Sequence, residues 1–308
     1  MTRMGRFTKT TILAVTLLTL VAACSGGGAP PPRKGQGLAK QYWKEGGDLA
    51  RRGNFDAAIS RYKQALEVQP DFLACLNDLG LVYIQKGWYD RAIGVFEQAL
   101  AYDDDYVEVR SGLCEAYWHL GNFDQCVAEA DIAIEHAPEL ARPHYWRGMA
   151  NRRLGRNEAA EGDLLRAIDR NSRYDVAHLA LGELYFQNGL YDKADMRFKA
   201  AIDSNPRRIQ AYMVWAQMKI KQGDLDAAYQ LLKRAIPKAP RMAAPHTMMG
   251  YVFLARSNRA GEAGDRNGYR SAAEEAMGQF KTALRFDRTD QDAQNGLDEA
   301  RRRLQGSD

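Results

Sequence analysis

Few residues in this sequence have the types and spacing that catalysis or metal binding would need. The five histidines lie far apart and none belongs to an H-E-x-x-H or C-x-x-C motif, so the sequence offers no ligand set for zinc. It has no phosphate-binding loop, G-x-S-x-G motif or dinucleotide glycine pattern. The consecutive acids Asp103, Asp104 and Asp105 are typical of a solvated turn. The sequence therefore predicts a protein that is not an enzyme, with no catalytic residues, metal, cofactor or small-molecule substrate.

The N-terminal segment has the build of a secretory signal peptide. Residues 1–9 carry Arg3, Arg6 and Lys9 without an acid, and the apolar run TTILAVTLLTLVAA follows them. That run is shorter than the roughly 20 apolar residues that a membrane-spanning helix needs. We therefore expect residues 1–23 to be a signal peptide that is removed on export.

The end of this segment, Val21-Ala22-Ala23-Cys24, resembles the lipobox of bacterial lipoproteins, in which the cysteine thiol receives diacylglycerol and the new amino terminus is acylated. The resemblance implies that Cys24 carries the membrane anchor, because two or more acyl chains hold a protein firmly at a membrane. Ser25 in place of Asp implies, by the same resemblance, the outer membrane facing the periplasm. Residues 24–38, which are rich in Gly and Pro, are then a lipidated cysteine and a flexible linker. A cysteine that merely follows an ordinary cleavage site is the alternative.

The net charge gives no sign of a nucleic-acid partner. Of the formal charge of +4, most comes from the three cations of residues 1–9. A nucleic-acid binder needs a clustered excess of Lys and Arg. The basic run Arg301, Arg302 and Arg303 is typical of the solvated end of a helix, so we expect no nucleic-acid binding.

From Ala39 onward the sequence repeats every 34 residues. Positions eight and twenty of the copies are small, as in Gly80 and Ala92 of the second copy, which lets two helices approach closely. A glycine at position fifteen ends the first helix, where a left-handed C-cap costs glycine little. In four copies a proline follows the second helix, which it cannot continue. The seven copies begin at Ala39, Leu73, Val107, Ala141, Asp175, Ile209 and Ala243.

This pattern resembles the tetratricopeptide repeat. The resemblance implies an all-α fold, a right-handed α-solenoid of tandem 34-residue helical hairpins whose stacked neighbours share a continuous core. Residues 39–290 hold the seven repeats, with a polar insertion at about 257–270 in the seventh that we expect to be a surface loop or a helix extension. Residues 291–308 should form a capping helix and tail, because a solenoid must cover its last apolar surface.

Two cysteines occupy facing positions in the third repeat. Cys114 and Cys126 take positions eight and twenty, which lie opposite each other across one hairpin. In an exported protein they can form a disulfide. The alternative is that both stay reduced and serve as small, buried apolar side chains. Cys75 is then left unpaired, and we expect it to be buried and inert. Three of the histidines share position four, which indicates a structural role.

The first helices of the repeats should line a concave groove, and the resemblance places positions two, five, nine, twelve and thirteen there. Aromatic residues and Arg dominate the binding energy of interfaces. We therefore expect the groove to bind protein or peptide segments, most simply an apolar helix or an extended segment. The main candidates are Trp43, Trp118, Tyr145, Arg152, Phe186, Met213 and Tyr251.

Two functions fit these features. The chain resembles the tetratricopeptide-repeat lipoproteins of type IV and Flp pilus systems, some of which pilot a secretin ring into the outer membrane. That resemblance implies a lipid-anchored periplasmic scaffold for pilus assembly or secretin piloting. The alternative is an adaptor that docks a peptidoglycan hydrolase or a protease at the membrane. Both functions need the same groove and anchor, so the sequence does not separate them.

Overall fold

The computed structural model describes residues 35–305, which are almost entirely helical. The signal peptide, Cys24 and all but the end of the predicted linker lie outside these residues. The first helices of the seven hairpins are α1 (Gln36–Arg51), α3 (Leu73–Gln85), α5 (Val107–Leu120), α7 (Ala141–Arg153), α9 (Asp175–Gln187), α11 (Ile209–Lys221) and α13 (Ala243–Glu262). Their partners are α2 (Phe55–Val68), α4 (Tyr89–Tyr102), α6 (Phe123–His136), α8 (Asn157–Arg170), α10 (Tyr191–Ser204), α12 (Leu225–Ala235), which the 3-10 turn η1 (Ile236–Lys238) extends, and α14 (Arg266–Phe286). The last helix is α15 (Gln291–Gln305).

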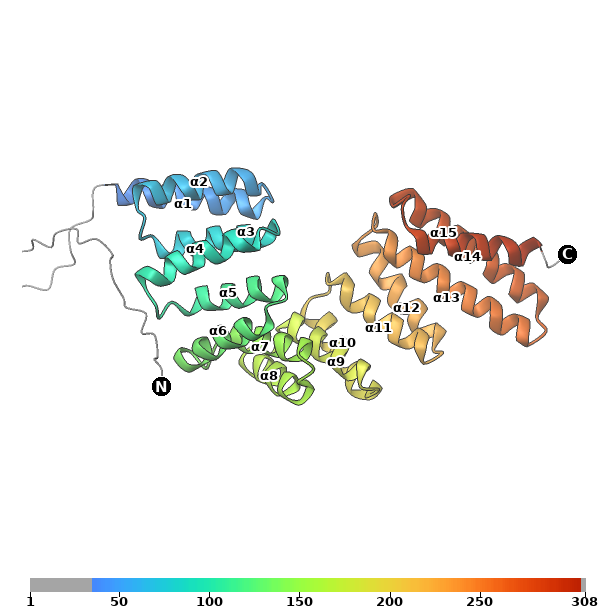
Figure 1. Ribbon diagram of the computed structural model, residues 1–308. Coiled ribbons are helices and arrows are strands. Elements are labelled where there is room, and N and C mark those ends of the chain that lie inside the picture. Colours follow the sequence, from blue (N-terminus) through green and yellow to red (C-terminus); the bar gives the residue numbers. More distant parts are fainter. Residues whose placement is uncertain (1–34, 306–308) are drawn as a thin grey trace, which may run out of the picture.

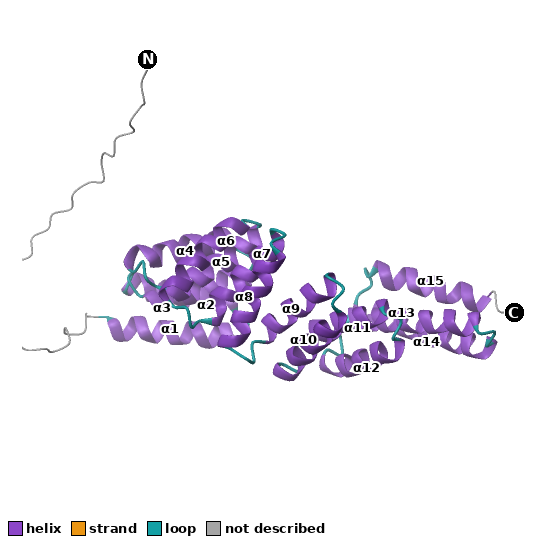
Figure 2. Ribbon diagram, turned by 90° about the horizontal axis from the view of Figure 1, so that it is seen from below, coloured by secondary structure: helices purple, strands orange, loops and turns teal. Residues whose placement is uncertain are grey.

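The hairpins stack in chain order, and the stack bends so that α1–α6 form one arm and α11–α15 the other (Figure 1). Short loops join the helices throughout (Figure 2). The predicted fold class, a right-handed α-solenoid of tandem helical hairpins, is confirmed. One boundary differs, because α1 begins at Gln36 and so includes the last residues of the predicted linker. None of the helices within residues 35–305 combines the length and apolar character that crossing a membrane would require.

Glycine ends the first helix of each regular hairpin in the predicted conformation. Gly121 has φ 82° and Gly189 has φ 73°, and the equivalent glycines of the other regular repeats also have positive φ. This left-handed region costs glycine little, because glycine has no Cβ to clash. The chain therefore reverses at the same point in each repeat, which fixes the register of the hairpins.

The two helices of a hairpin meet where a glycine faces an aromatic ring. A Cβ built on Gly80 would lie 2.2 Å from Cε1 of Phe96, and one built on Gly182 would lie 2.7 Å from Cε1 of Phe198. Both rings are fully buried. The small residue at position eight thus makes room for the large side chain at position twenty-four, and a glycine–ring contact of this kind forms the centre of the first, second, fifth and seventh hairpins.

The third repeat fills the same space differently. Position eight is Cys114 and position twenty-four is only Ala130, and a disulfide joins Cys114 to Cys126 with their Cα atoms 3.9 Å apart. Trp146 of the next repeat packs against this pair, and together they form a small core cluster between the two larger ones. Cys75 is a free, fully buried thiol.

The predicted insertion of the seventh repeat is a helix extension. α13 continues to Glu262 and α14 begins at Arg266, so the insertion lengthens both helices instead of forming a loop. Gly264 makes the turn at φ 75°, and Asp265 Oδ1 accepts a hydrogen bond from the backbone N–H of Gly268 at 2.9 Å. α15 packs on α13 and α14 with Ala293, Leu297 and Ala300 buried, as a capping helix would.

We predict one titratable thiol in the non-reduced, denatured Cys24→Ser chain and three after reduction, because only Cys75 is unpaired among the other cysteines. Replacing Cys114 and Cys126 by Ala should lower the free energy of unfolding by about 3 kcal/mol, the chain-entropy value for a loop of about 15 residues. Thiol titration and denaturant unfolding followed by circular dichroism measure the two effects, with Cys75→Ser as the control for the titration. Three titratable thiols before reduction would exclude the disulfide.

Candidate binding surface on the concave face

The first helices of the repeats form the inner layer of the curved stack. Consecutive first helices contact one another from α1 to α13 and on to α15. Within residues 35–305, consecutive second helices make few or no such contacts. Because neighbours are closest on the inside of a bend, the first helices line the concave side.

Ion pairs join neighbouring first helices at the middle of this face. Arg142 on α7 donates to Glu115 on α5 at 2.5 Å, and Arg152 on α7 donates to Glu183 on α9 at 2.8 Å. All four side chains are largely shielded from solvent. Gln210 on α11 also donates to Glu183, at 3.5 Å. These contacts connect α5, α7, α9 and α11 across the surface.

Two tyrosines lie among these charges. The rings of Tyr145, on α7, and Tyr174, just before α9, have centroids 5.3 Å apart. Burial raises the pKa of Tyr145 far above its usual range, and it raises the pKa of Tyr174 to about 12. Both phenols therefore stay neutral at physiological pH, and each presents an apolar ring with a hydroxyl that can donate a hydrogen bond.

We call this region the central concave surface, and Arg208 completes it. Arg208, just before α11, forms an ion pair with Asp175 at the start of α9, and it lowers the pKa of both tyrosines slightly against the effect of burial. The central concave surface comprises Glu115, Arg142, Tyr145, Arg152, Tyr174, Glu183, Phe186, Arg208 and Met213.

Four of the seven predicted groove residues belong to this surface. Tyr145 and Arg152 take part in the contacts just described. Phe186 lies on α9, with Lys221 Nζ 5.4 Å from its ring centroid. Met213 is partly exposed on α11.

The two predicted tryptophans also pack between repeats. The indole N–H of Trp43 donates to Asp78 at 2.7 Å, and its ring lies 5.4 Å from that of Phe72, so it joins the first repeat to the second. Trp118 packs on Trp146, with ring centroids 5.8 Å apart, and on Phe123. Both side chains are partly exposed, as that of Tyr145 is.

Tyr251 lies beside the capping helix and is 38% exposed. Its hydroxyl donates to the backbone carbonyl of Asp292 on α15 at 2.9 Å, and its ring packs on Phe280. An open pocket of about 440 Å³ beside it is lined mainly by α15 residues, including Asn295 and Arg302. The groove at the seventh repeat therefore also includes residues of α15.

Sequence reasoning missed Tyr174 and Arg208. Both precede a first helix, at position thirty-four of their repeats, outside the positions that the resemblance assigns to the groove. The fixed period provides the signal that could have found them, since the ring at position thirty-four packs on the ring at position five of the same repeat both in Tyr174 with Tyr145 and in Phe72 with Trp43.

The histidines at position four have a structural role. His144 Nε2 lies 3.1 Å from the carbonyl oxygen of Pro138, and His178 Nε2 lies 3.0 Å from that of Ser172. Burial lowers the pKa of both histidines, which favours the neutral ring. Each therefore holds the turn that precedes its helix.

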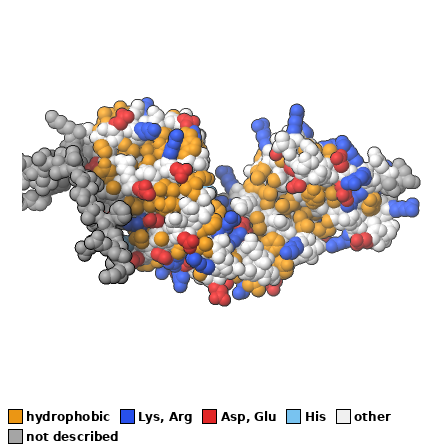
Figure 3. Space-filling view, viewed as in Figure 1, with side chains coloured by type: hydrophobic (Ala, Val, Ile, Leu, Met, Phe, Trp, Pro, Cys, Tyr) orange, Lys and Arg blue, Asp and Glu red, His pale blue; other side chains and the backbone are white. Residues whose placement is uncertain are grey.

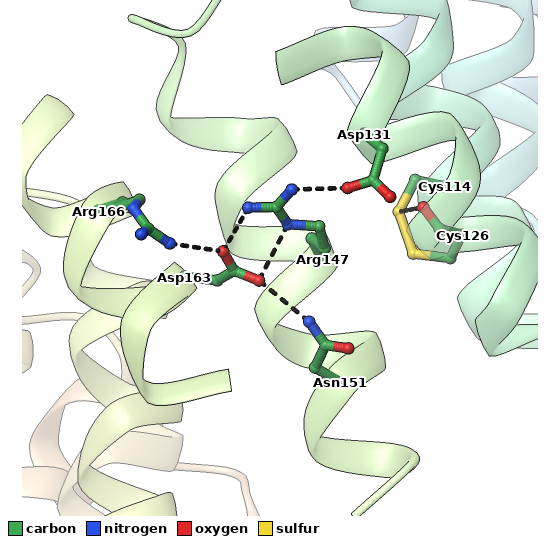
Figure 4. Close-up of polar contacts among 7 residues, drawn as sticks. All are labelled: Cys114, Cys126, Asp131, Arg147, Asn151, Asp163 and Arg166. Carbon is green, nitrogen blue, oxygen red and sulfur yellow. Dashed lines mark hydrogen bonds and ion pairs between the residues drawn. A yellow bond between two sulfur atoms is a disulfide. The ribbon is translucent and has the colours of Figure 1, made fainter. Parts of the chain in front are cut away.

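A second polar cluster lies in the fourth hairpin, on α6–α8 (Figure 4). Arg147 donates to both oxygens of the buried Asp163, at 3.0 and 2.6 Å, and also to Asp131 at 2.6 Å. Asn151 donates to Asp163 at 3.0 Å, and Arg166 lies 3.3 Å from it. Because the buried carboxylate has these partners, the cluster is an internal structural network.

Nothing in the described chain suggests a metal centre. Within residues 35–305, no group of three or more His, Cys, Asp or Glu side chains is placed to hold a metal ion.

Comparisons with known proteins agree with the repeat architecture. Family models described as tetratricopeptide repeat match residues 44–107, 83–151 and 177–243. A tetratricopeptide repeat protein from Parabacteroides merdae is 19% identical, with a TM-score of 0.58 over 85% of this chain and 98% of that one. A chain of the APC/C hetero-tetramer Cut9–Hcn1 is 16% identical, with a TM-score of 0.64 over 84% of this chain and 48% of that one. PilF of Pseudomonas aeruginosa is 17% identical, with a TM-score of 0.56 over 67% of this chain and 94% of PilF.

These identities show a shared fold alone, and no curated protein matches the chain. The family models, by contrast, together match more than half of the sequence. The matched residues form helical hairpins in the structure, with a glycine at the end of the first helix of each hairpin. The chain therefore belongs to the tetratricopeptide repeat family.

Proposed function

We propose that this chain is a lipid-anchored periplasmic scaffold whose central concave surface binds a protein segment during assembly of an envelope machine, with pilus biogenesis or secretin piloting as the specific role. One observation carries the binding part of the proposal. Two neutral tyrosines lie side by side between ion pairs that connect the three consecutive first helices α5, α7 and α9. A rigid aromatic pair within a charged frame is the composition of a protein-binding hot spot.

The arrangement also suits an extended or helical segment in particular. The ion pairs hold the first helices in place before any partner arrives, which reduces the ordering cost of binding. Tetratricopeptide repeats generally bind protein or peptide segments, and stacked repeats give extended concave surfaces for this purpose.

The pilus role rests on weaker support. The lipobox-like Val21–Cys24 motif suggests attachment to a membrane, and it lies outside the described residues. PilF shares the fold at 17% identity. An adaptor for a cell-wall hydrolase or a protease would use the same anchor and surface, so identification of the captured partner decides between the two roles.

We predict that Tyr174→Ala weakens partner binding about 30-fold or more, because truncating a central aromatic typically costs about 2 kcal/mol. Met196→Ala is the matched control, because Met196 is 63% exposed and projects from a second helix. The partner is first captured from crosslinked envelopes, and its affinity for each variant is then measured together with thermal melting. If Tyr174→Ala melts normally and binds normally, the partner uses another surface.

We predict that Cys24→Ser releases the protein into the soluble periplasmic fraction or leaves an unprocessed precursor, because the lipid is expected to be attached to this thiol. Cys75→Ser is the control, since Cys75 is buried in the fold. Fractionation and immunoblotting measure the location and the processing of both variants. A processed Cys24→Ser protein that still sediments with membranes would contradict lipid anchoring at Cys24.

A further inference from the structure

Three arginines occupy the same place in three consecutive repeats. Arg173, Arg207 and Arg241 each take position thirty-three, in the turn that joins a second helix to the next first helix. All three side chains are exposed, and within residues 35–305 none of them forms an ion pair. We call these three residues the arginine row.

The three turns share one backbone geometry. In each of them the N–H of position thirty-four donates to the carbonyl oxygen of position thirty-one, at 3.0 or 3.1 Å. The backbone N–H groups of Arg173 and Arg207 also donate to the side chains of Asn171 and Asn205, both at 3.1 Å. The side chains of the row therefore start from equivalent backbone positions in successive repeats.

The arginine row borders the central concave surface. Tyr174 and Arg208, which belong to that surface, directly follow Arg173 and Arg207 in the chain. The two acids of the surface, and Asp175 beside it, already bind its own arginines. The row therefore adds positive charge that these acids do not neutralise.

Two further acids lie close to the row in the chain, at the ends of α8 and α10. Asp169 has an ion-pair partner in Arg170, at 3.5 Å. Asp203 is exposed and has no ion pair in the described part of the chain, so it offsets one positive charge at most.

The third turn of the row, between α12 and α13, carries additional cations. Arg234 and Lys238 are exposed, and they lie 5.3 and 5.9 Å from the ring centroid of Tyr212. Residues 227–261, which include this turn, contain six Lys and Arg residues and no acid. On the face shown in Figure 3, Lys and Arg also outnumber acids over the arm of α11–α15. An anionic ligand is therefore favoured along this part of the solenoid.

Position thirty-three holds an acid in each of the first three repeats, namely Asp71, Asp105 and Glu139. Acids repel an anionic ligand, so such a ligand is confined to repeats four to six. A narrow chain follows these three turns alone, whereas the wide plane of an anionic membrane would also approach the acidic turns. The row therefore suits a protein segment better than a lipid surface.

We propose that the partner segment bound by the central concave surface carries acidic side chains that pair with the arginine row. The inference rests on the proposed function, whose surface it extends. Packed helices lie roughly 8–10 Å apart. A polyproline II segment rises about 3.1 Å per residue with about three residues per turn. Acids at every third residue of such a segment therefore lie on one side of it, at about the spacing of the repeats.

Fluorescence anisotropy with a defined peptide tests this inference on the chain that begins at Ser25, which keeps every described residue. The probe is a labelled peptide of four Glu-Pro-Pro units, and the same peptide with Gln in place of Glu is the reference. At about 0.01 M ionic strength, where the Debye length is about 30 Å, we expect the Glu peptide to bind at least tenfold more tightly. The difference should vanish at about 1 M, where the Debye length is about 3 Å. Equal affinities at low ionic strength would overturn the proposal.

Substitution of the row locates the binding site. The row variant carries Arg173→Gln, Arg207→Gln and Arg241→Gln. We expect it to bind the Glu peptide about tenfold more weakly than the parent, since three exposed ion pairs of ordinary strength account for about that factor. Circular dichroism checks that the variant is folded. A folded row variant with the affinity of the parent would contradict the proposal.

The control variant removes the same charge elsewhere, through Lys63→Gln, Lys199→Gln and Lys233→Gln. These lysines are exposed at position twenty-five of second helices, and within residues 35–305 none of them forms an ion pair. The control should bind the Glu peptide like the parent. If it weakens as much as the row variant, net charge rather than the row governs binding and the proposal fails.

The outcomes also separate this inference from the proposed function. If Tyr174→Ala loses affinity for the captured partner while the Glu peptide binds regardless of the row, the proposed function stands and this inference fails. If the Glu peptide depends on the row while Tyr174→Ala binds the captured partner normally, the row is supported as an acid-binding site and the proposed function fails. A row variant that keeps its affinity for the Glu peptide but loses binding to phosphatidylglycerol vesicles would assign the row to a membrane and overturn the proposal.

Discussion

The architecture depends on one close contact, that between a glycine on the first helix of a hairpin and a ring on the second. A Cβ on Gly80 would come within 2.2 Å of the Phe96 ring, and one on Gly112 of the following repeat would come within 2.5 Å of the same ring. One side chain therefore sets both the width of its own hairpin and the approach of the next. Phe280 acts in the same way on Gly250 and on Gly296 of α15, so the capping helix joins the stack by the same contact. Interiors packed at this density leave no room for an added methyl group unless neighbours move.

The contact at each hairpin also determines what the concave face can present. Because each first helix docks in the same register, residues of α5, α7, α9 and α11 fall side by side, and the ion pairs of Arg142 and Arg152 can span neighbouring repeats. The contact differs in three repeats, since the sixth has Ala216 and Leu232 at the two positions and the third and fourth depart from it at the centre of the solenoid. The third repeat replaces the ring and glycine with a disulfide and with Trp146 from its neighbour, and the fourth places the Arg147–Asp163 pair within its hairpin. Figure 4 shows the disulfide and the Arg147–Asp163 pair next to each other.

The period of the sequence was enough to predict the hairpins, their glycine turns and the capping helix, because these features depend on local backbone preferences and on residue size. Among the predicted groove residues, Tyr145 and Arg152 do take part in contacts between neighbouring first helices or the turns before them. The period did not predict that Trp43 and Trp118 would pack between repeats, because a position on a helix does not tell how far a large ring turns toward its neighbour. Nor did it predict the hydrogen bond of Tyr251 to α15, since the path of α15 over the seventh repeat is a tertiary contact with no signature in the repeat itself.

The most direct measurement of the central claim compares two glycines in one hairpin. Gly80 faces Phe96, whereas a Cβ on Gly94, in α4, would have no neighbour within 4 Å. Gly80→Ala should lower the free energy of unfolding by about 1–3 kcal/mol, the cost of overpacking a core. Gly94→Ala should raise it by about 0.5–1 kcal/mol, because alanine is the better helix former. Denaturant unfolding of both variants, followed by circular dichroism, gives the two values. A Gly80→Ala protein as stable as the parent would show that the glycine–ring contact does not set the packing of the hairpins.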